Sequence, residues 1–537
     1  MPERIDITQL PECDLTDDGG RRLEARLLTA DDLTGAVRDA VEAGWAVMPA
    51  GGLTSAINSF SYDRAAAEAF KGVVAIRPRG ATAVEIVPAS TPIEALASNQ
   101  MSIEPEAGLV TVGAGLSFEQ ANQALARAVG PDARILVDLT SVGSAQAGGV
   151  MATGGMGPLR RRPSTSCVAL ALATGLPEPL IVEGDEVPSH QGMQGWTGMA
   201  TALRMRFFRT PPFEFGLVLP VQSSDTDTLA ELLTYLHPWT AVTPSAETER
   251  LVGQVDPGTI LNGIELVGRD ALADFVANAQ DQAVRAKALG LLQSCDYANA
   301  DFLACLTGWS EHSVEDVLGV LLDAETETIG GVQIDYGVGF SSGGEMEAFR
   351  AIREGAPDLA RTRARVIQPG KLKPWSASTD IDVAAPRDVT AIVPLLTAYE
   401  DYRDAIAGLT EQFEGRVDIS LAAYGHLSPH GIDPHHRVVL IAPEGGEQGL
   451  ADARFMVQAG KKALIRALVR AAHDRGCVVT GGEKGIPSVL EIASALGGEH
   501  HMPHNLVERI ERARRALAAA PANFTFRAPA ELRGTTR

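Results

Sequence analysis

The chain carries at residues 45–55 the stretch WAVMPAGGLTS, in which an apolar run ends at Pro49 and a glycine turn begins. Gly51 and Gly52 allow the backbone to take positive φ values and allow a bulky ligand to approach it closely. Successive backbone N–H groups in such a turn form a concave site for anions, and the hydroxyls of Thr54 and Ser55 add hydrogen-bond donors. The stretch is therefore typical of a strand that ends at a pyrophosphate, although an ordinary strand-to-turn connection has the same pattern.

A second glycine-rich stretch, SVGSAQAGGVMATGGMGP, covers residues 141–158 and contains no charged residue. Its small side chains would let a flat or extended ligand lie against the backbone. A low-complexity loop is the alternative, but the apolar Val150 and Met151 argue against full exposure to solvent. Together the two glycine clusters predict a cradle for a single dinucleotide.

The apolar spacing around these clusters predicts short strands and isolated helices, which is an α+β pattern. Asp31 or Asp32 is expected to cap a helix that ends before Gly44, and Ser117 or Glu119 is expected to begin another. Strands are expected at 45–48, 73–76, 85–87, 109–112, 203–208, 215–220, 259–267 and 330–336, and later helices at 228–236, 271–292, 314–322, 458–475 and 506–519.

Composition limits the classes of function. A chain of 537 residues has room for several domains, and its formal net charge of −22 argues against a general nucleic-acid binder. The five cysteines include no CxxC pair, which disfavours a disulfide framework and a cysteine-based metal site. No run approaches the roughly 18–20 apolar residues of a membrane-spanning helix. We therefore expect a cytoplasmic protein without a transmembrane segment, with peripheral membrane contact and a homodimer left open.

Three segments, taken in order, resemble the PCMH-type FAD-binding domain of the vanillyl-alcohol oxidase and D-lactate dehydrogenase superfamily. They are PAGGLTS at 49–55, VTVGAGLSFEQANQAL at 110–125 and AGGVMATGGMG at 147–157. The resemblance implies an α+β fold class, with a two-subdomain FAD-binding domain and an α/β cap domain that carries an antiparallel sheet. The implied bounds are 1–29 for an N-terminal lead-in, 30–210 for the FAD-binding domain, 211–457 for the cap and 458–537 for a C-terminal helical segment that returns to the FAD-binding domain.

In that family the first loop holds the FAD pyrophosphate, and the second glycine stretch runs along the ribityl chain towards the flavin ring. Members that attach FAD covalently often carry a histidine in the first loop. Leu53 occupies that neighbourhood here, which implies non-covalent FAD. The segment 194–199 differs from the family's usual Ser-Glu-Gly-Thr-Leu-Gly-Ile, so part of the pocket is expected to be rebuilt. The implied cofactor-binding residues are Pro49, Gly51, Gly52, Thr54, Ser55, Gly148, Gly149, Ala152 and Thr153.

Four of the eleven histidines fall in the stretch GHLSPHGIDPHH at 425–436. It is predicted to be a loop between one strand at 416–424 and another at 438–442. Imidazole is a common ligand of divalent metals, whereas a surface loop or buried, hydrogen-bonded histidines are the alternatives.

The histidine stretch resembles the Gly-His-Leu-Gly-Asp-Gly-Asn-Leu-His motif of the D-2-hydroxyacid dehydrogenase branch. Several members of that branch bind a divalent metal through the two motif histidines and a later glutamate. His426 matches the first histidine, His435 or His436 the second, and Glu483 the glutamate. Neighbouring residues of a strand point to opposite faces, so only one of the two later histidines should be a ligand. The implied metal is zinc, manganese or iron.

Two cationic residues match the substrate-binding positions of the same branch. Arg353, in EMEAFRAIRE at 345–354, corresponds to an arginine that binds the substrate carboxylate through paired N–H groups. Lys484 replaces a histidine near the substrate, where it can act as a base, hold the carboxylate or pair with Glu483. An exposed, ion-paired arginine is the alternative for Arg353. The implied catalytic residues are Arg353, Lys484 and His426.

These features predict an FAD-dependent dehydrogenase that oxidises a lactate-like D-2-hydroxy acid to the 2-oxo acid by metal-assisted hydride transfer to the flavin. Its partners would be a small anionic substrate and an electron acceptor, which is a quinone, an electron-transfer protein or oxygen. Two alternatives stay open. One is a metal-free phenol or alcohol oxidase of the vanillyl-alcohol type. The other is a non-catalytic flavin-binding partner subunit, which the altered segments 194–199 and 483–487 favour.

Overall fold

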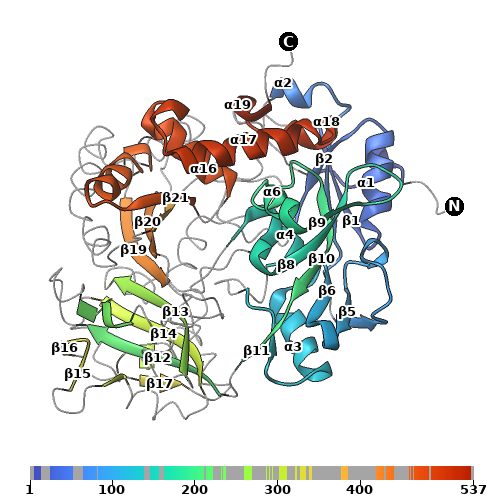
Figure 1. Ribbon diagram of the computed structural model, residues 1–537. Helices are drawn as coiled ribbons and strands as arrows, with labels where there is room; N and C mark the ends of the chain where they lie inside the picture. The colour runs from blue at the N-terminus through green and yellow to red at the C-terminus, as the bar shows by residue number, and fades with distance from the viewer. Residues whose placement is uncertain are drawn as a thin grey trace.

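Five β-sheets organise the described part of the chain, and they form two halves that C-terminal helices connect (Figure 1). The structure is a computed structural model. It describes residues 5–13, 24–51, 64–80, 83–137, 145–155, 163–210, 213–221, 231–232, 234–236, 259–268, 286, 289–290, 293, 302–310, 321–322, 327–333, 338–340, 376–384, 419–428, 431–440, 459, 461–463, 465–482 and 485–533.

The first half begins with a parallel sheet of order β1-β3-β2. Helix α1, Leu33–Glu42, follows β1, and the Asp32 side chain caps it by accepting a hydrogen bond of 2.8 Å from Gly35 N. This confirms the expected helix and its cap. The apolar face of α1 is buried between this sheet and strands β8 and β10 of the next one. The bounds are Ala25–Ala30 for β1, Ala46–Pro49 for β2, Val73–Pro78 for β3 and Arg64–Ala67 for the short helix α2.

A six-stranded sheet of order β4-β5-β6-β10-β8-β9 completes the first half. Helix α3, Phe118–Ala128, starts at a capping box of Ser117 and Gln120 and packs its apolar face on this sheet. The remaining elements are β4 Glu85–Val87, β5 Gln100–Glu104, β6 Leu109–Gly113, β8 Cys167–Ala173, β9 Leu180–Glu183, β10 Met199–Arg206, α5 Pro163–Ser166, α6 Val187–His190 and the two-stranded pair β7 Ala133–Arg134 and β11 Phe208–Arg209.

The second glycine-rich stretch contains a helix, α4, at Ala147–Thr153. Its two glycines lower helix propensity, but tertiary packing overrides this cost. Val150 and Met151 are buried against the six-stranded sheet. The helix also brings Gly148 close to Ala114, which follows β6. A side chain at position 148 would prevent this approach.

The second half is built on an eight-stranded sheet in which every pair is antiparallel, in the order β17-β12-β14-β13-β19-β20-β18-β21. One face of its central strands is apolar and faces helices, with Leu217, Ile264 and Leu306 in one core. The bounds are Phe213–Val221 for β12, Thr259–Gly268 for β13, Phe302–Ser310 for β14, Val338–Phe340 for β17, Ser376–Ala384 for β18, Ile419–Ser428 for β19, Gly431–Leu440 for β20 and Val478–Gly482 for β21.

Two sequence expectations in this half are corrected. The single strand expected at 330–336 is instead a hairpin, in which β15 Thr328–Ile329 and β16 Val332–Gln333 flank Gly330 and Gly331, both at positive φ. The predicted histidine loop is a second hairpin, because the paired strands β19 and β20 extend to Ser428 and Gly431. Glycine, proline and aspartate in this stretch indicated a loop, but pairing on both sides of β20 overrides those preferences.

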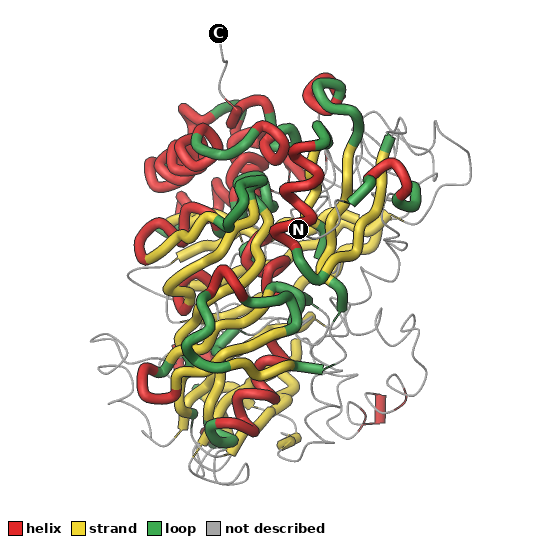
Figure 2. The backbone as a smooth tube through the Cα atoms, turned by 90° about the vertical axis from the view of Figure 1, so that its right-hand side faces the viewer, coloured by secondary structure: helices red, strands yellow, loops and turns green. Residues whose placement is uncertain are grey.

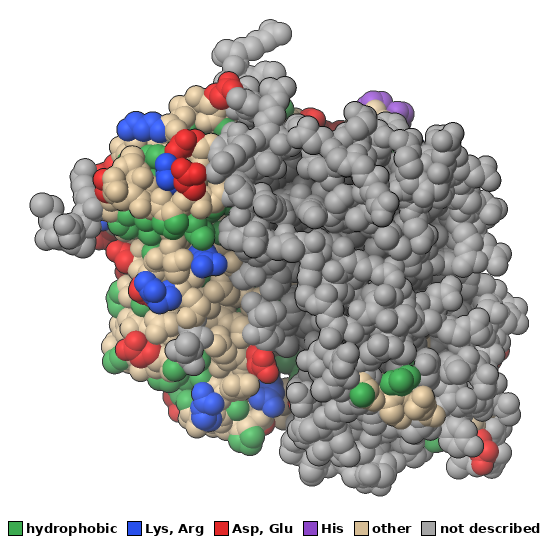
Figure 3. Space-filling model, turned by 180° about the vertical axis from the view of Figure 1, so that it is seen from behind, with side chains coloured by type: hydrophobic (Ala, Val, Ile, Leu, Met, Phe, Trp, Pro, Cys, Tyr) green, Lys and Arg blue, Asp and Glu red, His purple; other side chains and the backbone are tan. Residues whose placement is uncertain are grey.

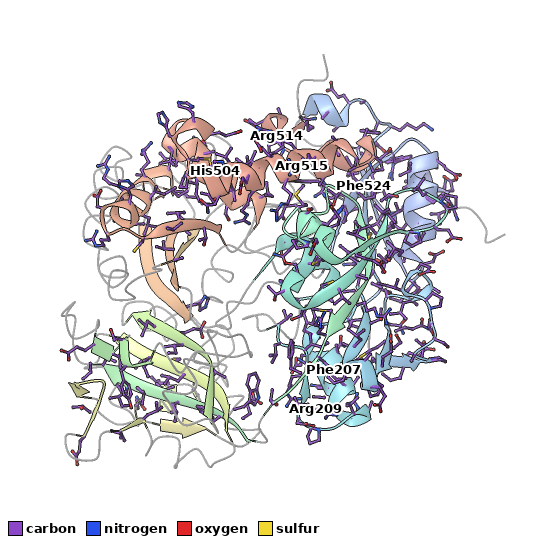
Figure 4. All side chains as sticks on the ribbon, in the orientation of Figure 1. Phe207, Arg209, His504, Arg514, Arg515 and Phe524 are labelled. Atoms are coloured by element: carbon purple, nitrogen blue, oxygen red, sulfur yellow. The ribbon has the colours of Figure 1, made fainter. Side chains whose placement is uncertain are left out.

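The C-terminal helices cross from the second half to the first (Figures 1 and 2). Helix α17 contacts β21 at one end of this path and α6 of the first half further along. Phe524 on α18 (labelled in Figure 4) is fully buried in the core of the first half. Beside it, Asn523 Nδ2 donates a hydrogen bond of 2.7 Å to Trp45 O. The bounds are Ile486–Leu496 for α16, His504–Ala518 for α17, Ala522–Thr525 for α18 and Ala530–Arg533 for α19.

The described surface carries acidic and basic side chains interspersed over short distances (Figure 3). Several of them form ion pairs, such as Arg209 with Asp132 at 2.6 Å and Arg79 with Asp31 at 3.0 Å. Exposed pairs of this kind contribute little to stability. Within the described residues, no helix combines the length and the apolar character needed to cross a bilayer.

Candidate functional site

The two glycine clusters meet in space. A Cβ atom built on Gly51, just after β2, would lie 3.6 Å from Gly149 Cα and 3.4 Å from Gln146 Oε1 at the start of α4. Two backbones can approach this closely only where side chains are absent. The structure therefore brings Gly51, two residues after Pro49, together with α4. Gly52, Thr54 and Ser55, the remaining predicted residues of the first loop, lie outside the described residues.

The two adjacent glycines of α4 have different surroundings. Gly148 faces the protein: its N–H donates a hydrogen bond of 3.1 Å to Ala114 O, and a Cβ on it would lie 2.8 Å from Ala114 Cβ. A Cβ on Gly149, in contrast, would meet no described atom within 4 Å. Gly148 thus serves helix packing, whereas Gly149 presents a bare backbone beside Gly51.

A buried amide oxygen lies at the same place. Gln146 Oε1 is buried and, among the described residues, has no hydrogen-bond partner. Such an atom costs free energy unless a polar group meets it. The amide of glutamine can present either its oxygen or its NH₂ group, and a hydroxyl can pair with both. A ligand hydroxyl that lies beside Gly51 and Gly149 could therefore pair with this amide.

A buried turn at residues 191–198 is hydrogen-bonded to the backbone of α4. Gln194 N donates a hydrogen bond of 2.7 Å to Ala152 O, and Gln194 takes a φ of +51°. Thr153, the last predicted residue of this stretch, uses its hydroxyl to donate to Gly149 O at 2.9 Å. The turn is therefore joined to α4 through Gln194.

Arg527, from the C-terminal segment, holds this turn. Its side chain is 3% exposed, and Nη2 donates a hydrogen bond of 2.8 Å to Gln194 O. A Cβ on Gly195 would lie 2.9 Å from Pro49 Cγ and 3.5 Å from the same guanidinium nitrogen. One buried cation thus lies beside both the turn and the end of β2.

The start of α16 packs against the same turn. A Cβ on Gly192 would lie 2.6 Å from Gly485 Cα, and Ile486 N donates a hydrogen bond of 3.2 Å to Gly192 O. Both glycines have positive φ, near +70°. Glu483 and Lys484 directly precede Gly485 in the sequence but lie outside the described residues, as does Arg353.

Two titratable groups near the cradle have shifted pKa values. Burial lowers the pKa of His190 below 6.5, against an opposing effect of Glu186, and His190 Nδ1 lies 3.0 Å from Thr197 Oγ1. Burial raises the pKa of the Cys167 thiol to about 12, although its hydrogen bond to Ala169 O acts in the opposite direction. Burial thus disfavours the protonated form of His190 and the thiolate form of Cys167.

A second polar feature lies in the eight-stranded sheet. His426 of β19 and Glu265 of β13 are directly opposite each other, and their Nε2 and Oε1 atoms are 2.8 Å apart. Their side chains are 3% and 1% exposed. Imidazole and carboxylate are both ligands of divalent metals. Among the described side chains, however, no three of the histidine, cysteine, aspartate and glutamate type form a metal-ligand group.

Strand register separates the two later histidines. His435 is opposite Tyr424 of β19 and Asp380 of β18, whereas His436 is opposite Ala423 and Thr379. Directly opposed residues share a face of a sheet, and Tyr424 and His426 share a face because they are two residues apart. His435 and Asp380 therefore belong to the face of His426 and Glu265, and His436 belongs to the other face.

Sequence reasoning missed Gln146, Arg527 and Glu265. Glu265 had a signal, because it is the single charged residue of the largely apolar stretch TILNGIELVG at 259–268. Gln146 lies inside the second glycine cluster and is its most polar side chain, which is a weaker signal. Nothing in the sequence around Arg527 marks it.

The fold of this chain is similar to folds found in solved structures. The structure of 4-ethylphenol oxidase from Gulosibacter chungangensis, an isoeugenol complex, matches 93% of this chain and 88% of its own at 11% identity, with a TM-score of 0.54. Two crystal forms of an alkyldihydroxyacetonephosphate synthase match 84% of this chain, and 74% and 75% of their own, at 12% identity and a TM-score of 0.49. No protein-family model and no curated protein matches the sequence. The first of these likenesses confirms the expected α+β fold class.

Proposed function

We propose that the chain is an FAD-dependent oxidoreductase that binds its cofactor non-covalently along the surface that Gly51 and α4 form together. The observation that carries this proposal is the contact of two glycine backbones, Gly51 and Gly149, next to the buried amide oxygen of Gln146. An extended dinucleotide needs a long bare backbone to lie on, and its ribityl hydroxyls suit an amide that has no described partner. Leu53, in place of an attaching histidine, supports non-covalent binding.

Each part of the cradle has a separate task in this proposal. Gly51 and Gly149 let the cofactor approach, Gln146 pairs with a hydroxyl, and the turn at 191–198 closes the wall behind Ala152. Gly52, Thr54 and Ser55 supply anion-binding donors by the sequence argument. FAD held by these residues would supply a hydride acceptor, and the protein would orient the substrate and exclude competing reactions.

The finer proposal is that the substrate is a lactate-like D-2-hydroxy acid. It depends on the histidine motif and on Arg353, which would bind the substrate carboxylate through paired N–H groups. The motif histidines would hold a zinc, manganese or iron ion that makes the substrate hydroxyl more acidic. His426 lies in a buried, polar part of the sheet beside Glu265, which supports a chemical role for it. Lys484 would contact the substrate near the start of α16.

A second candidate function is a phenol or alcohol oxidase. It is favoured by the fold match to a 4-ethylphenol oxidase over almost the whole of both chains. It would need no metal, and it would leave the His426–Glu265 pair as a structural feature of the sheet.

An anaerobic titration tests these proposals. The purified protein should show a flavin spectrum, and heat or acid should release free FAD into the supernatant. Addition of D-lactate or a larger D-2-hydroxy acid should then bleach the flavin absorbance, whereas the L-enantiomer serves as the control. Bleaching by a 4-alkylphenol alone would favour the second candidate. A flavin that no substrate bleaches would favour a non-catalytic flavin-binding subunit, and a protein that neither contains nor takes up FAD would overturn the proposal.

A further inference from the structure

A hollow of about 630 Å³ lies among the C-terminal elements. Its walls come from a helix over residues 465–474, the start of β21, the end of α16 and the segment that leads into α17. His504, which directly follows the lining residue Pro503, marks its neighbourhood in Figure 4. Gly485, which packs on the turn at 191–198, lies at the opposite end of α16, roughly 16 Å away along the helix axis. We call this hollow the C-terminal groove.

The described side chains that line the groove include basic residues and no acidic one. The basic residues are Arg466, Arg470, His473 and His501. The first three occupy positions i, i+4 and i+7 of one helix and therefore share a face. The chain as a whole has a formal net charge of −22, so this wall has the opposite sign to the rest of the molecule. A concave wall of one sign concentrates ions of the other sign.

The two arginines are available to such an ion. Among the described residues, neither Arg466 nor Arg470 has an ion-pair partner. The acidic residues nearby in the sequence are paired elsewhere: Glu499 with Arg514 at 2.5 Å, and Asp474 with the exposed ring of His473 at 3.5 Å. Two guanidinium groups one helical turn apart can each bind a carboxylate or a phosphate through parallel N–H groups.

The floor of the groove is apolar. Val469 and Leu496 contribute partly buried side chains, while Val479 and Met502 are buried. Covering such a floor with an alkyl chain removes apolar surface from water. The volume is also in the range of small-molecule sites, which is roughly 300–1,000 Å³. A basic wall over an apolar floor matches a molecule with an anionic head and an apolar body.

We infer that the C-terminal groove binds a free amphiphilic anion, an alkyl chain with a carboxylate or phosphate head, with the head at Arg466 and Arg470. A bilayer surface matches less well. Among the described residues, Val478 is the one large apolar side chain of the groove that is strongly exposed, at 41%, whereas membrane-surface sites insert a whole apolar face. Neither flavin nor metal takes part, so the groove is independent of the proposed function.

Calorimetric titration of the whole flavin-containing protein with dodecanoate, below its micelle concentration, tests the groove. We expect one site per chain. Decanoate and octanoate should bind more weakly, by roughly threefold to fourfold for each methylene lost from the floor. Dodecanol, acetate and inorganic phosphate, which each lack one half of the ligand, should bind much more weakly. Dodecyl phosphate in place of dodecanoate shows which head the arginines prefer.

Single variants locate the head. Arg466→Gln and Arg470→Gln should each weaken dodecanoate binding roughly tenfold or more, because a charged hydrogen-bond donor is lost. Arg475→Gln is the matched control: it removes the same charge just beyond the same helix, but Arg475 does not line the groove. This variant should bind as the wild type does.

A pair of opposite charges at one exposed position separates electrostatics from damage to the fold. Val478→Glu should abolish dodecanoate binding, whereas Val478→Lys should keep or strengthen it, and both side chains are similarly unfavourable in a strand. The far-ultraviolet circular dichroism of all variants should match the wild type.

Three results would overturn this assignment. They are dodecanol binding as tightly as dodecanoate, equal weakening in Arg475→Gln and Arg470→Gln, and binding to anionic phospholipid vesicles without binding of free dodecanoate or dodecyl phosphate. The flavin spectrum of the same samples reports on the cofactor separately. A groove that binds no amphiphile therefore leaves the FAD proposal intact, and a flavin-free protein that binds dodecanoate keeps the groove.

Discussion

At Arg527 a full positive charge lies in the interior, 3% exposed, where it donates to the carbonyl of Gln194. Burying such a group is costly, and the cost is recovered only if its N–H groups are satisfied. The acceptor belongs to a residue at positive φ, in the turn that holds α4. A residue near the C-terminus therefore fixes the shape of a wall of the candidate cofactor site.

Replacing Arg527 with methionine should destabilise the protein and loosen its cofactor. The variant keeps most of the apolar stem but leaves a buried carbonyl oxygen without its charged donor, a loss of about 1–3 kcal/mol. Urea unfolding and the ratio of FAD to protein after gel filtration measure the two effects. Arg512→Met, at an exposed position on α17, is the control. A variant as stable and as rich in flavin as the wild type would contradict this role.

His190 should make stability depend on pH below its ordinary pKa of 6.5. Burial lowers its pKa in the folded state, so between that lowered value and 6.5 the unfolded chain binds a proton that the folded chain does not. Stability should therefore fall as the pH decreases through this window, by at most about 1.4 kcal/mol per pH unit. In urea titrations at pH 5.5–7.5 (roughly the relevant range), His190→Asn should flatten that slope. An equal slope in both proteins would rule out His190 as its source.

At the scale of single elements, α4 is the clearest case of one sequence feature with two tasks. Its two glycines are consecutive, yet Gly148 packs on Ala114 and Gly149 lies beside Gly51.

The hairpin of β19 and β20 shows how a proline fits into a strand. The β18 ladder passes from His435 directly to Ile432, and skips Pro434, which has no N–H to donate. A proline is thus tolerated inside a central strand.

Alanine at the two glycines of α4 should have opposite effects. Gly148→Ala would place a Cβ 2.8 Å from Ala114 Cβ and should destabilise the flavin-free protein by about 1–3 kcal/mol. Gly149→Ala meets no described atom and adds helix propensity, so the flavin-free protein should be unchanged or up to about 1 kcal/mol more stable. Its affinity for FAD should nevertheless fall. Fluorescence titration of the flavin-free proteins measures affinity, and full FAD affinity in Gly149→Ala would argue against the cradle.

At the scale of the whole molecule, the C-terminal segment makes the two halves interdependent. Gly485 packs on Gly192, Arg527 on Gln194, and Asn523 and Phe524 on the first sheet and its helix. The candidate cradle therefore contains walls from the start, the middle and the end of the chain. Its completion requires that the last residues fold back onto the first ones.

Phe524→Ala should unfold the first half more than the second. The ring is fully buried in the core that contains α1, so its removal should cost about 3–5 kcal/mol. Limited proteolysis followed by mass spectrometry should show earlier cleavage within the first half, together with loss of FAD. Leu176→Ala, at a side chain 58% exposed, should change little. Cleavage confined to the second half would contradict this arrangement.

The sequence by itself determined the local elements and the type of fold. Asp32 and Ser117 mark helix starts, and the glycine clusters point to a dinucleotide cradle, because caps and glycine turns act over a few residues. Only the tertiary structure decided which residues meet. The pairing of Gly51 with Gly149, the role of Arg527, the helical form of α4 and the choice of face for His435 all depend on contacts between residues far apart in the chain. Register and long-range packing are properties of the whole sheet, and no local pattern encodes them.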